Sequence, residues 1–178
     1  MSSTGKVSMN VFDLIKRRRS IRKYKETVVE QERLNTVLEA ARLAPSADNK
    51  QPWVFIVVTD PHVKERLRSS YDEEWFIKAP VIIVGCAAPN EAWRRIDGEE
   101  YWKVDVAIAM QNLVLAATEL GLGTCWIADF NEKAAKEVLR IPEDVRVVAM
   151  TPLGYPDQEK GPVTGRKPLN TIIRHDKW

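Results

Sequence analysis

The sequence is short of the residues that build metal centres and disulfide frameworks. Its 178 residues include only two cysteines and two histidines, and neither cysteine belongs to a C-x-x-C pair. A zinc site or a disulfide framework needs more such residues at closer spacing. We therefore expect no metal site, and we expect Cys86 and Cys125 to be inert, buried thiols, because a free cysteine usually behaves as a small hydrophobic residue.

Long hydrophobic runs are also missing. The longest apolar stretch, residues 79–89, is much shorter than the roughly 20 residues that cross a bilayer as a helix. The first residues contain no apolar segment of the kind found in secretory signals. The sequence therefore predicts a soluble protein of the cytoplasm that has no membrane partner.

Glycine-rich phosphate-binding loops are absent as well. No G-x-G-x-x-G motif and no P-loop follows any of the predicted strands. A nucleotide, if the protein binds one, is therefore not held by a Rossmann fingerprint.

Positive charge, by contrast, is concentrated in one segment. Residues 16–25 read KRRRSIRKYK and contain seven lysines and arginines, although the net charge of the chain is only +2. A surface that binds nucleic acid usually carries a positive excess spread over a whole face. Concentrated charge favours a site for one small anion. Nucleic-acid binding by this segment is the alternative from another class, and its affinity would fall steeply with salt concentration.

Hydrophobic periodicity predicts five helices, at residues 10–19, 27–45, 61–71, 101–123 and 131–139. Asn10 and Asn131 are suited to cap the first and last of these helices. Thr27 and Glu30 have the spacing of a capping box, and Pro61 suits a first helical turn.

Four strands are predicted, at residues 53–59, 80–86, 124–130 and 145–156. The first two are continuous β-branched runs, which are typical of strands covered on both faces. Strands that alternate with helices predict one layered α/β or α+β domain over residues 1–178. The last residues, 157–178, show little periodicity but carry Leu169, Ile172, Ile173 and Trp178. We expect them to form an extended arm that packs on another surface, such as that of a second subunit.

Several segments together resemble a known family. They are RRSIR at 18–22, APSADNKQPWVF at 44–55 and GLGTCWIADF at 121–130, followed by LGYP at 153–156 and RKP at 166–168. In this order they resemble the nitroreductase family of FMN-dependent oxidoreductases, from about Phe12 to Trp178. The resemblance implies a three-layer α/β/α fold. Its central sheet would be mixed but mostly antiparallel, with a long core helix and an extended C-terminal arm.

The resemblance also implies an FMN site at the interface of a homodimer. The phosphate and ribityl chain would be held by a first group, namely Arg18, Arg19, Ser20, Arg22 and Arg166. Paired, charge-assisted hydrogen bonds from arginine suit a phosphate. The partner chain would contribute a second group, namely Pro45, Ser46, Ala47, Asn49 and Gln51. The side-chain amides of this group match both the donors and the acceptors on the flavin edge.

A third group, Trp126, Ile127 and Ala128, would lie against the flavin ring and direct a backbone N–H at its reactive N5. Asp129 stands where many relatives have glycine. The resemblance implies a ping-pong reaction in which NADH or NADPH reduces FMN and a nitroaromatic, quinone or similar acceptor reoxidises it. No catalytic side chain is predicted, because the cofactor carries the chemistry. The alternatives are a dehalogenase, dehydrogenase or flavin-remodelling enzyme of the same fold, and a non-catalytic flavin-binding protein.

Overall fold

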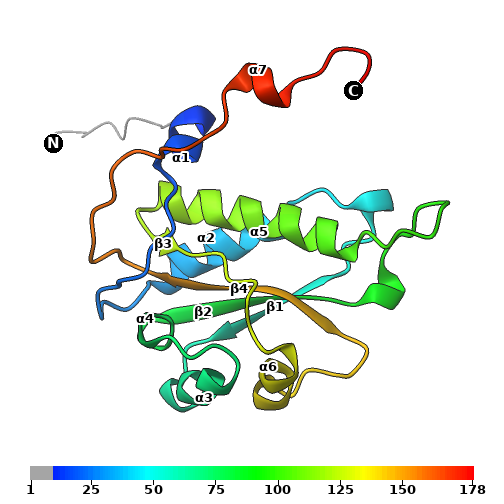
Figure 1. Cartoon of the computed structure of the whole chain (residues 1–178). Helices are drawn as coiled ribbons and strands as arrows, with labels where there is room; N and C mark the ends of the chain where they lie inside the picture. The colour runs from blue at the N-terminus through cyan, green and yellow to red at the C-terminus, as the bar shows by residue number, and fades with distance from the viewer. Residues whose placement is uncertain (1–9) are drawn as a thin grey trace, which may run out of the picture.

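The computed structural model describes residues 10–178, which fold around an antiparallel sheet of four strands in the order β1-β2-β4-β3. The strands are β1 (Trp53–Val58), β2 (Val81–Ala87), β3 (Gly123–Thr124) and β4 (Arg146–Gly154). Helices cover both faces of the sheet (Figure 1). The predicted three-layer fold is therefore confirmed. A parallel bridge joins Ser20 to Thr124 at the edge of the sheet.

The helices divide between the two faces. They are α1 (Val11–Arg17), α2 (Gln31–Arg42), α3 (Pro61–Arg66), α4 (Glu74–Ile77), α5 (Trp102–Glu119), α6 (Glu132–Leu139) and α7 (Leu169–Ile172). The helices α2 and α5 cover one face, whereas α3, α4 and α6 cover the other (Figure 1). The predicted caps at Asn10 and Asn131 and the first-turn Pro61 are confirmed. Among the described helices, none has both the length and the apolar character needed to cross a membrane.

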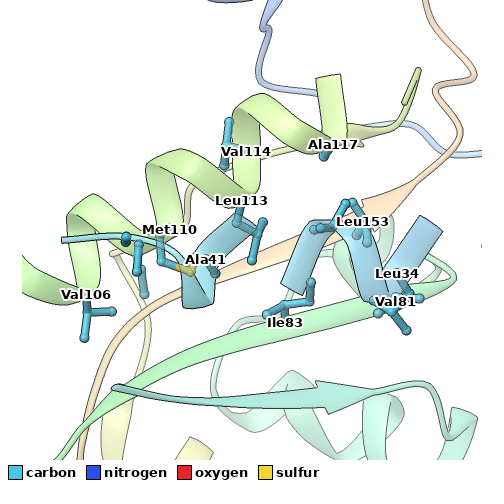
Figure 2. Close-up of a cluster of buried hydrophobic side chains, with 14 of the residues drawn as sticks. Leu34, Ala41, Val81, Ile83, Val106, Met110, Leu113, Val114, Ala117 and Leu153 are labelled. Carbon is cyan, nitrogen blue, oxygen red and sulfur yellow. The ribbon is translucent and has the colours of Figure 1, made fainter. Parts of the chain in front are cut away.

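The core is built on β2, which is buried along its whole length. Side chains of a strand alternate between its two faces. Ile83 therefore packs beneath α2 and α5 with Met110, whereas Ile82 and Val84 belong to the cluster under α3, α4 and α6. Figure 2 shows the first cluster, in which Met110 and Leu113 of α5 lie over the sheet. The prediction of a strand covered on both faces is confirmed for β2 but is wrong for β1, an edge strand in which Val54 is 55% exposed.

Several predicted boundaries are wrong. The helix expected at 61–71 ends at Arg66, and two other boundaries are set by partners distant in sequence. The helix expected from Thr27 begins at Gln31, and Glu30 forms no side-chain cap. The carboxylate of Glu30 instead accepts a hydrogen bond of 2.6 Å from the hydroxyl of Tyr155. The strand expected at 124–130 is limited to Gly123–Thr124, because the chain then leaves the sheet and returns only at Ile127, which bridges Met150. In both cases a partner distant in sequence replaces the local pattern.

The chain continues beyond β4 as an extended arm. Its first part is fastened to the arginine segment, since Lys23 pairs with Asp157 at 2.8 Å and Tyr24 bridges Pro156. Its last part leads away from the sheet to α7 (Figure 1), a short helix that was not predicted. Leu169 and Ile172 of α7 are 69% and 62% exposed in the single chain.

Candidate functional site

The arginine segment, residues 18–22, lies along the edge of the sheet. The helix α1 ends at Arg17, with Arg18 as its C-cap, and the chain then extends so that the N–H of Ile21 donates to the carbonyl of Thr124 at 2.8 Å. A Cβ atom on Gly123 would lie only 2.7 Å from the side chain of Ile21. A glycine is thus required at position 123 for the segment to come this close.

Neighbouring residues of the segment face opposite sides, as alternation along an extended chain requires. Arg18 lines a pocket together with Arg166, whereas Arg19 and Ile21 line a different pocket. The structure thus brings Arg18 and Arg166 together, as the resemblance implied. The Arg19 side chain does not join them, which departs from the predicted grouping.

The pocket of Arg18 and Arg166 has a volume of about 410 Å³. Its walls come from α1, α5 and the arm, and its remaining lining residues are Ile15, Lys16, Gln111 and Val163. Within residues 10–178, neither Arg18 nor Arg166 has a carboxylate partner. Two guanidinium groups without a counter-charge at one pocket favour a bound anion.

Arg22 lies beside two aromatic residues that the sequence analysis did not single out. Its guanidinium carbon is 5.7 Å from the centre of the Trp75 ring, and that ring meets Tyr71 edge-on at 5.9 Å. Burial, followed by the nearby carboxylate of Glu73, raises the pKa of Tyr71. The aromatic pair at positions 71 and 75 was the available signal, but aromatic residues at helical spacing usually belong to a core.

The loop at residues 45–51 has a strained backbone. Asp48, Asn49 and Gln51 have φ angles of 52°, 53° and 51°, which residues other than glycine rarely adopt. Such residues cost on the order of 1 kcal/mol or more each and concentrate at functional sites. The hydroxyl of Ser46 accepts from the N–H of Gln51 at 2.9 Å and holds the loop in shape. Asn49 and Gln51 remain exposed, as does Pro45.

A buried carboxylate anchors this loop. Asp105 of α5 is only 1% exposed, and its Oδ1 accepts from the N–H of Ala47 at 2.9 Å. Its Oδ2 has no hydrogen-bond partner among the described residues. A buried polar oxygen without a hydrogen-bond partner is costly, which points to a role for Asp105 in shaping the loop. Sequence reasoning missed Asp105, although an aspartate between two valines in the first turn of a largely apolar helix was a visible signal.

In the segment at 126–128, Ile127 is buried in the core, whereas Trp126 and Ala128 are exposed to solvent. Ile127 is 4% exposed, and its N–H donates to the carbonyl of Met150 at 2.9 Å. Its side chain packs in the core beneath α3 and α6, so it does not face outward as expected. Trp126 is 40% exposed, and Ala128 and Asp129 are exposed too. Within the described part of the chain, the N–H groups of Trp126 and Ala128 have no acceptor.

The predicted groups do not all meet within one chain. The loop at 45–51 is anchored near the start of α5, whereas the arginine segment lies beside Gly123, just beyond its end. Since α5 has 18 residues, it is about 27 Å long. Figure 1 shows the loop and β3 at opposite ends of this helix.

The described residues contain no group of three His, Cys, Asp or Glu side chains arranged to hold a metal. The buried thiol of Cys86 has a pKa raised to about 12, chiefly by burial. Such a thiol is a poor nucleophile, so Cys86 is not a candidate catalytic residue.

Comparison with known proteins gives one consistent family. The model of the Nitroreductase family matches residues 15–75 and 68–155. The chain is 39% identical over 163 residues to a protein of Methanothermobacter thermautotrophicus named "Putative NADH dehydrogenase/NAD(P)H nitroreductase", and the match covers 88% of this chain and 83% of that protein. It is also 31% identical over 201 residues to iodotyrosine deiodinase 1 of Sus scrofa, which covers 93% of this chain and 68% of that protein.

Solved structures agree with the sequence matches. A nitroreductase family protein from Clostridium difficile 630 superposes with a TM-score of 0.87 at 30% identity, covering 96% of this chain and 100% of that chain. An FMN-dependent nitroreductase from Clostridium difficile R20291 has a TM-score of 0.79 at 32% identity, covering 94% of this chain and 100% of that chain.

Proposed function

This chain belongs to the nitroreductase family, and from that premise we propose that it is an FMN-dependent oxidoreductase. The reductant is NADH or NADPH, and the acceptor is a nitroaromatic, a quinone or a similar small molecule. The names of two similar proteins, one an NADH dehydrogenase and one an FMN-dependent nitroreductase, support this assignment. When bound, FMN supplies the redox chemistry by accepting hydride from the nicotinamide and passing electrons to the acceptor.

The observation that carries the proposal is the pocket shared by Arg18 and Arg166. The terminal phosphate of FMN carries a charge near −2, like that of a phosphorylated side chain. Planar guanidinium groups bind such a phosphate through paired hydrogen bonds. We assign the phosphate to these two arginines. Ser20 and Arg22 alternate onto the same side of the segment as Arg18, where they follow the cofactor toward its ring.

The chain's own residues also fit the ring. The unpaired N–H groups of Trp126 and Ala128 flank Ile127, whose own N–H is taken by Met150. A backbone donor aimed at the ring stabilises negative charge there without reorganising during the reaction. The half-exposed Trp126 side chain offers an apolar surface for the ring or the acceptor. Asp129 places a negative charge nearby and discourages acidic acceptors.

The second predicted group reaches the flavin only from another chain. Because the loop at 45–51 and the arginine segment lie at opposite ends of α5, we assign Pro45, Ser46, Ala47, Asn49 and Gln51 to the site of the partner in a homodimer. Two chains that pack with their α5 helices antiparallel would bring one loop to each arginine segment.

Exposed apolar side chains support this dimer. Val104 and Ile108 on α5 are 44% and 37% exposed, and Phe12 and Ile15 on α1 are 73% and 50% exposed. Exposed apolar side chains gathered on neighbouring helices often mark an interface. The exposed side chains of α7 give the arm the same character.

The test begins with flavin retention. Purified protein is incubated with FMN, desalted and examined by visible absorption, and we expect flavin bands to remain. NADH or NADPH should then bleach them without oxygen, and a nitroaromatic should restore them. A colourless protein after desalting overturns the flavin assignment. If flavin is retained but neither nucleotide bleaches it, only the assignment of NADH or NADPH as the reductant fails.

Dehalogenation is the second candidate, and it rests on the 31% identity with iodotyrosine deiodinase 1 of Sus scrofa. Reduced, flavin-loaded protein is offered iodotyrosine and a nitroaromatic in parallel reactions. If iodide is released from iodotyrosine faster than the nitroaromatic is reduced, dehalogenation would be favoured over nitroreduction.

A further inference from the structure

A second pocket lies on the other side of the arginine segment from Arg18. It has a volume of about 460 Å³. Its walls are the last turn of α1, the turn that follows α5, and residues 156–162 of the arm. Its lining includes four cationic side chains, those of Lys16, Arg17, Arg19 and Lys160, and no aspartate or glutamate.

Three of these four cations lack a counter-charge among the described residues. Lys16, Arg19 and Lys160 have no carboxylate partner within residues 10–178. Lys23, only a few residues away, has one in Asp157 at 2.8 Å. Cations held close together without a counter-charge repel one another, so an anion in the pocket would relieve that repulsion.

Hydrogen bonds across the pocket hold its walls together. The guanidinium of Arg19 donates to the carbonyl of Gly161, and Nζ of Lys160 donates to the carbonyl of Ser20 at 2.6 Å. A guanidinium has five N–H donors and an ammonium has three. Most donors of both groups therefore remain available to a ligand, while the bonds already made fix where the side chains lie.

We propose that this second pocket binds a phosphate group other than the phosphate of FMN. The alternation of the segment directs Arg18 to one pocket and Arg19 to the other, and of the cationic side chains only Lys16 lines both. The volume falls within the range of about 300–1,000 Å³ that is usual for small-molecule sites. The ligand is therefore a phosphorylated small molecule. Its distinction from FMN, though not the anion site itself, rests on the proposed function.

The experiment uses the FMN-loaded protein and inorganic pyrophosphate. Isothermal titration calorimetry at low ionic strength should show one pyrophosphate bound per chain, with the FMN absorbance unchanged. The double variant Arg19→Gln/Lys160→Gln should weaken this binding at least tenfold, because glutamine keeps a donor but loses the charge, and neither residue lines the pocket of Arg18 and Arg166. The matched control is Lys25→Gln, which removes one charge from the basic stretch 16–25 at a position outside the pocket and should leave binding unchanged.

Three outcomes would overturn the proposal. They are the absence of pyrophosphate binding to the wild-type protein, equal binding by the double variant, and release of FMN as pyrophosphate binds. The last would place the anion in the flavin site. If the protein retains no FMN, the proposed function fails by absorbance alone, and the same titration still tests the pocket in the flavin-free protein.

Steady-state kinetics separates two sources of the phosphate. If Lys160→Gln raises KM for NADPH but not for NADH, the ligand is the 2′-phosphate of the reductant. If both KM values are unchanged while pyrophosphate binding is lost, the ligand is a separate phosphorylated compound. Either result supports a phosphate site.

Discussion

At the scale of the residue, the direction in which an arginine side chain points decides which pocket it lines, even for neighbours within one motif. Arg18 and Arg19 are adjacent, yet they line different pockets. The reason is the two-residue repeat of extended backbone, anchored by the hydrogen bond between Ile21 and Thr124.

Replacement of Arg18 should therefore act on the flavin. Arg18→Ala should weaken FMN binding about 10- to 100-fold, because a hydrogen bond to a charged group contributes about 1.5–3 kcal/mol. Quenching of flavin fluorescence measures the dissociation constant. Lys25→Ala, which removes a charge from the basic stretch 16–25 away from the pocket, is the control. An unchanged affinity in Arg18→Ala would remove Arg18 from the site.

Asp105 should act through the loop that it anchors. Asp105→Ala removes the acceptor for the N–H of Ala47, so FMN affinity should fall several-fold. Asp105→Asn keeps an acceptor oxygen at the same place and should restore most of that affinity. If the two variants lose affinity equally while their thermal unfolding temperatures differ, Asp105 supports the fold and does not position the loop.

At the scale of the element, the position of the arginine segment depends on the close contact between Ile21 and Gly123 of β3 at the edge of the sheet. A Cβ atom on Gly123 would lie 2.7 Å from Ile21. Gly123→Ala should therefore displace the segment, with a loss of stability of about 1–3 kcal/mol from overpacking and weaker FMN binding. Gly161→Ala is the matched control, since a Cβ atom there meets nothing within 4 Å. Urea unfolding and flavin titration of both variants make the comparison, and equal behaviour would contradict the packing argument.

An ion pair ties α6 to β4. Nε and Nη2 of Arg146 donate to the two carboxylate oxygens of Glu132, each at 2.8 Å. The N–H of Val147 donates to the same carboxylate at 2.9 Å. Hydrogen bonding to Arg146 lowers the pKa of Glu132 from its ordinary value of 4.5. The pair therefore contributes fully above about pH 4.5, and its contribution is lost as pH falls through the lowered pKa.

Glu132→Gln should consequently reduce the free energy of unfolding at pH 7. The expected loss is below about 1 kcal/mol, because solvent screens a partly exposed pair. Urea unfolding at pH 7 and pH 4 should show a smaller pH dependence in the variant than in the wild-type protein. An unaltered pH dependence would show that the pair does not contribute.

At the scale of the whole molecule, a single chain holds only part of the proposed site. The arginine segment and the loop at 45–51 lie at opposite ends of α5 (Figure 1), and Val104 and Ile108 are exposed on α5. Completion of the site by a second chain accounts for both facts.

Disruption of that face should separate the chains. Ile108→Glu places a charge on the outer face of α5, where Ile108 is 37% exposed. Light scattering should show a dimer for the wild-type protein and a monomer with weakened FMN binding for the variant. Ile96→Glu is the control, because Ile96 is fully exposed outside α5. A variant that stays dimeric, or a monomer that binds FMN as tightly as before, would contradict the shared site.

The amino-acid sequence by itself determined the features that depend on near neighbours. The caps at Asn10 and Asn131, the first-turn Pro61 and the buried β2 follow from local hydrogen bonding and periodicity, which act over a few residues. The family motifs, read in order, also indicated the three-layer fold.

Only the tertiary structure decided what depends on partners far along the chain. The hydroxyl of Tyr155 displaces the capping box at Glu30, and the early departure of the chain from the sheet shortens β3. The contact of Ile21 with Thr124 sets which pocket each arginine faces, and Asp105 reaches back to Ala47. Such pairings depend on how distant segments pack, and no local pattern in the sequence encodes them.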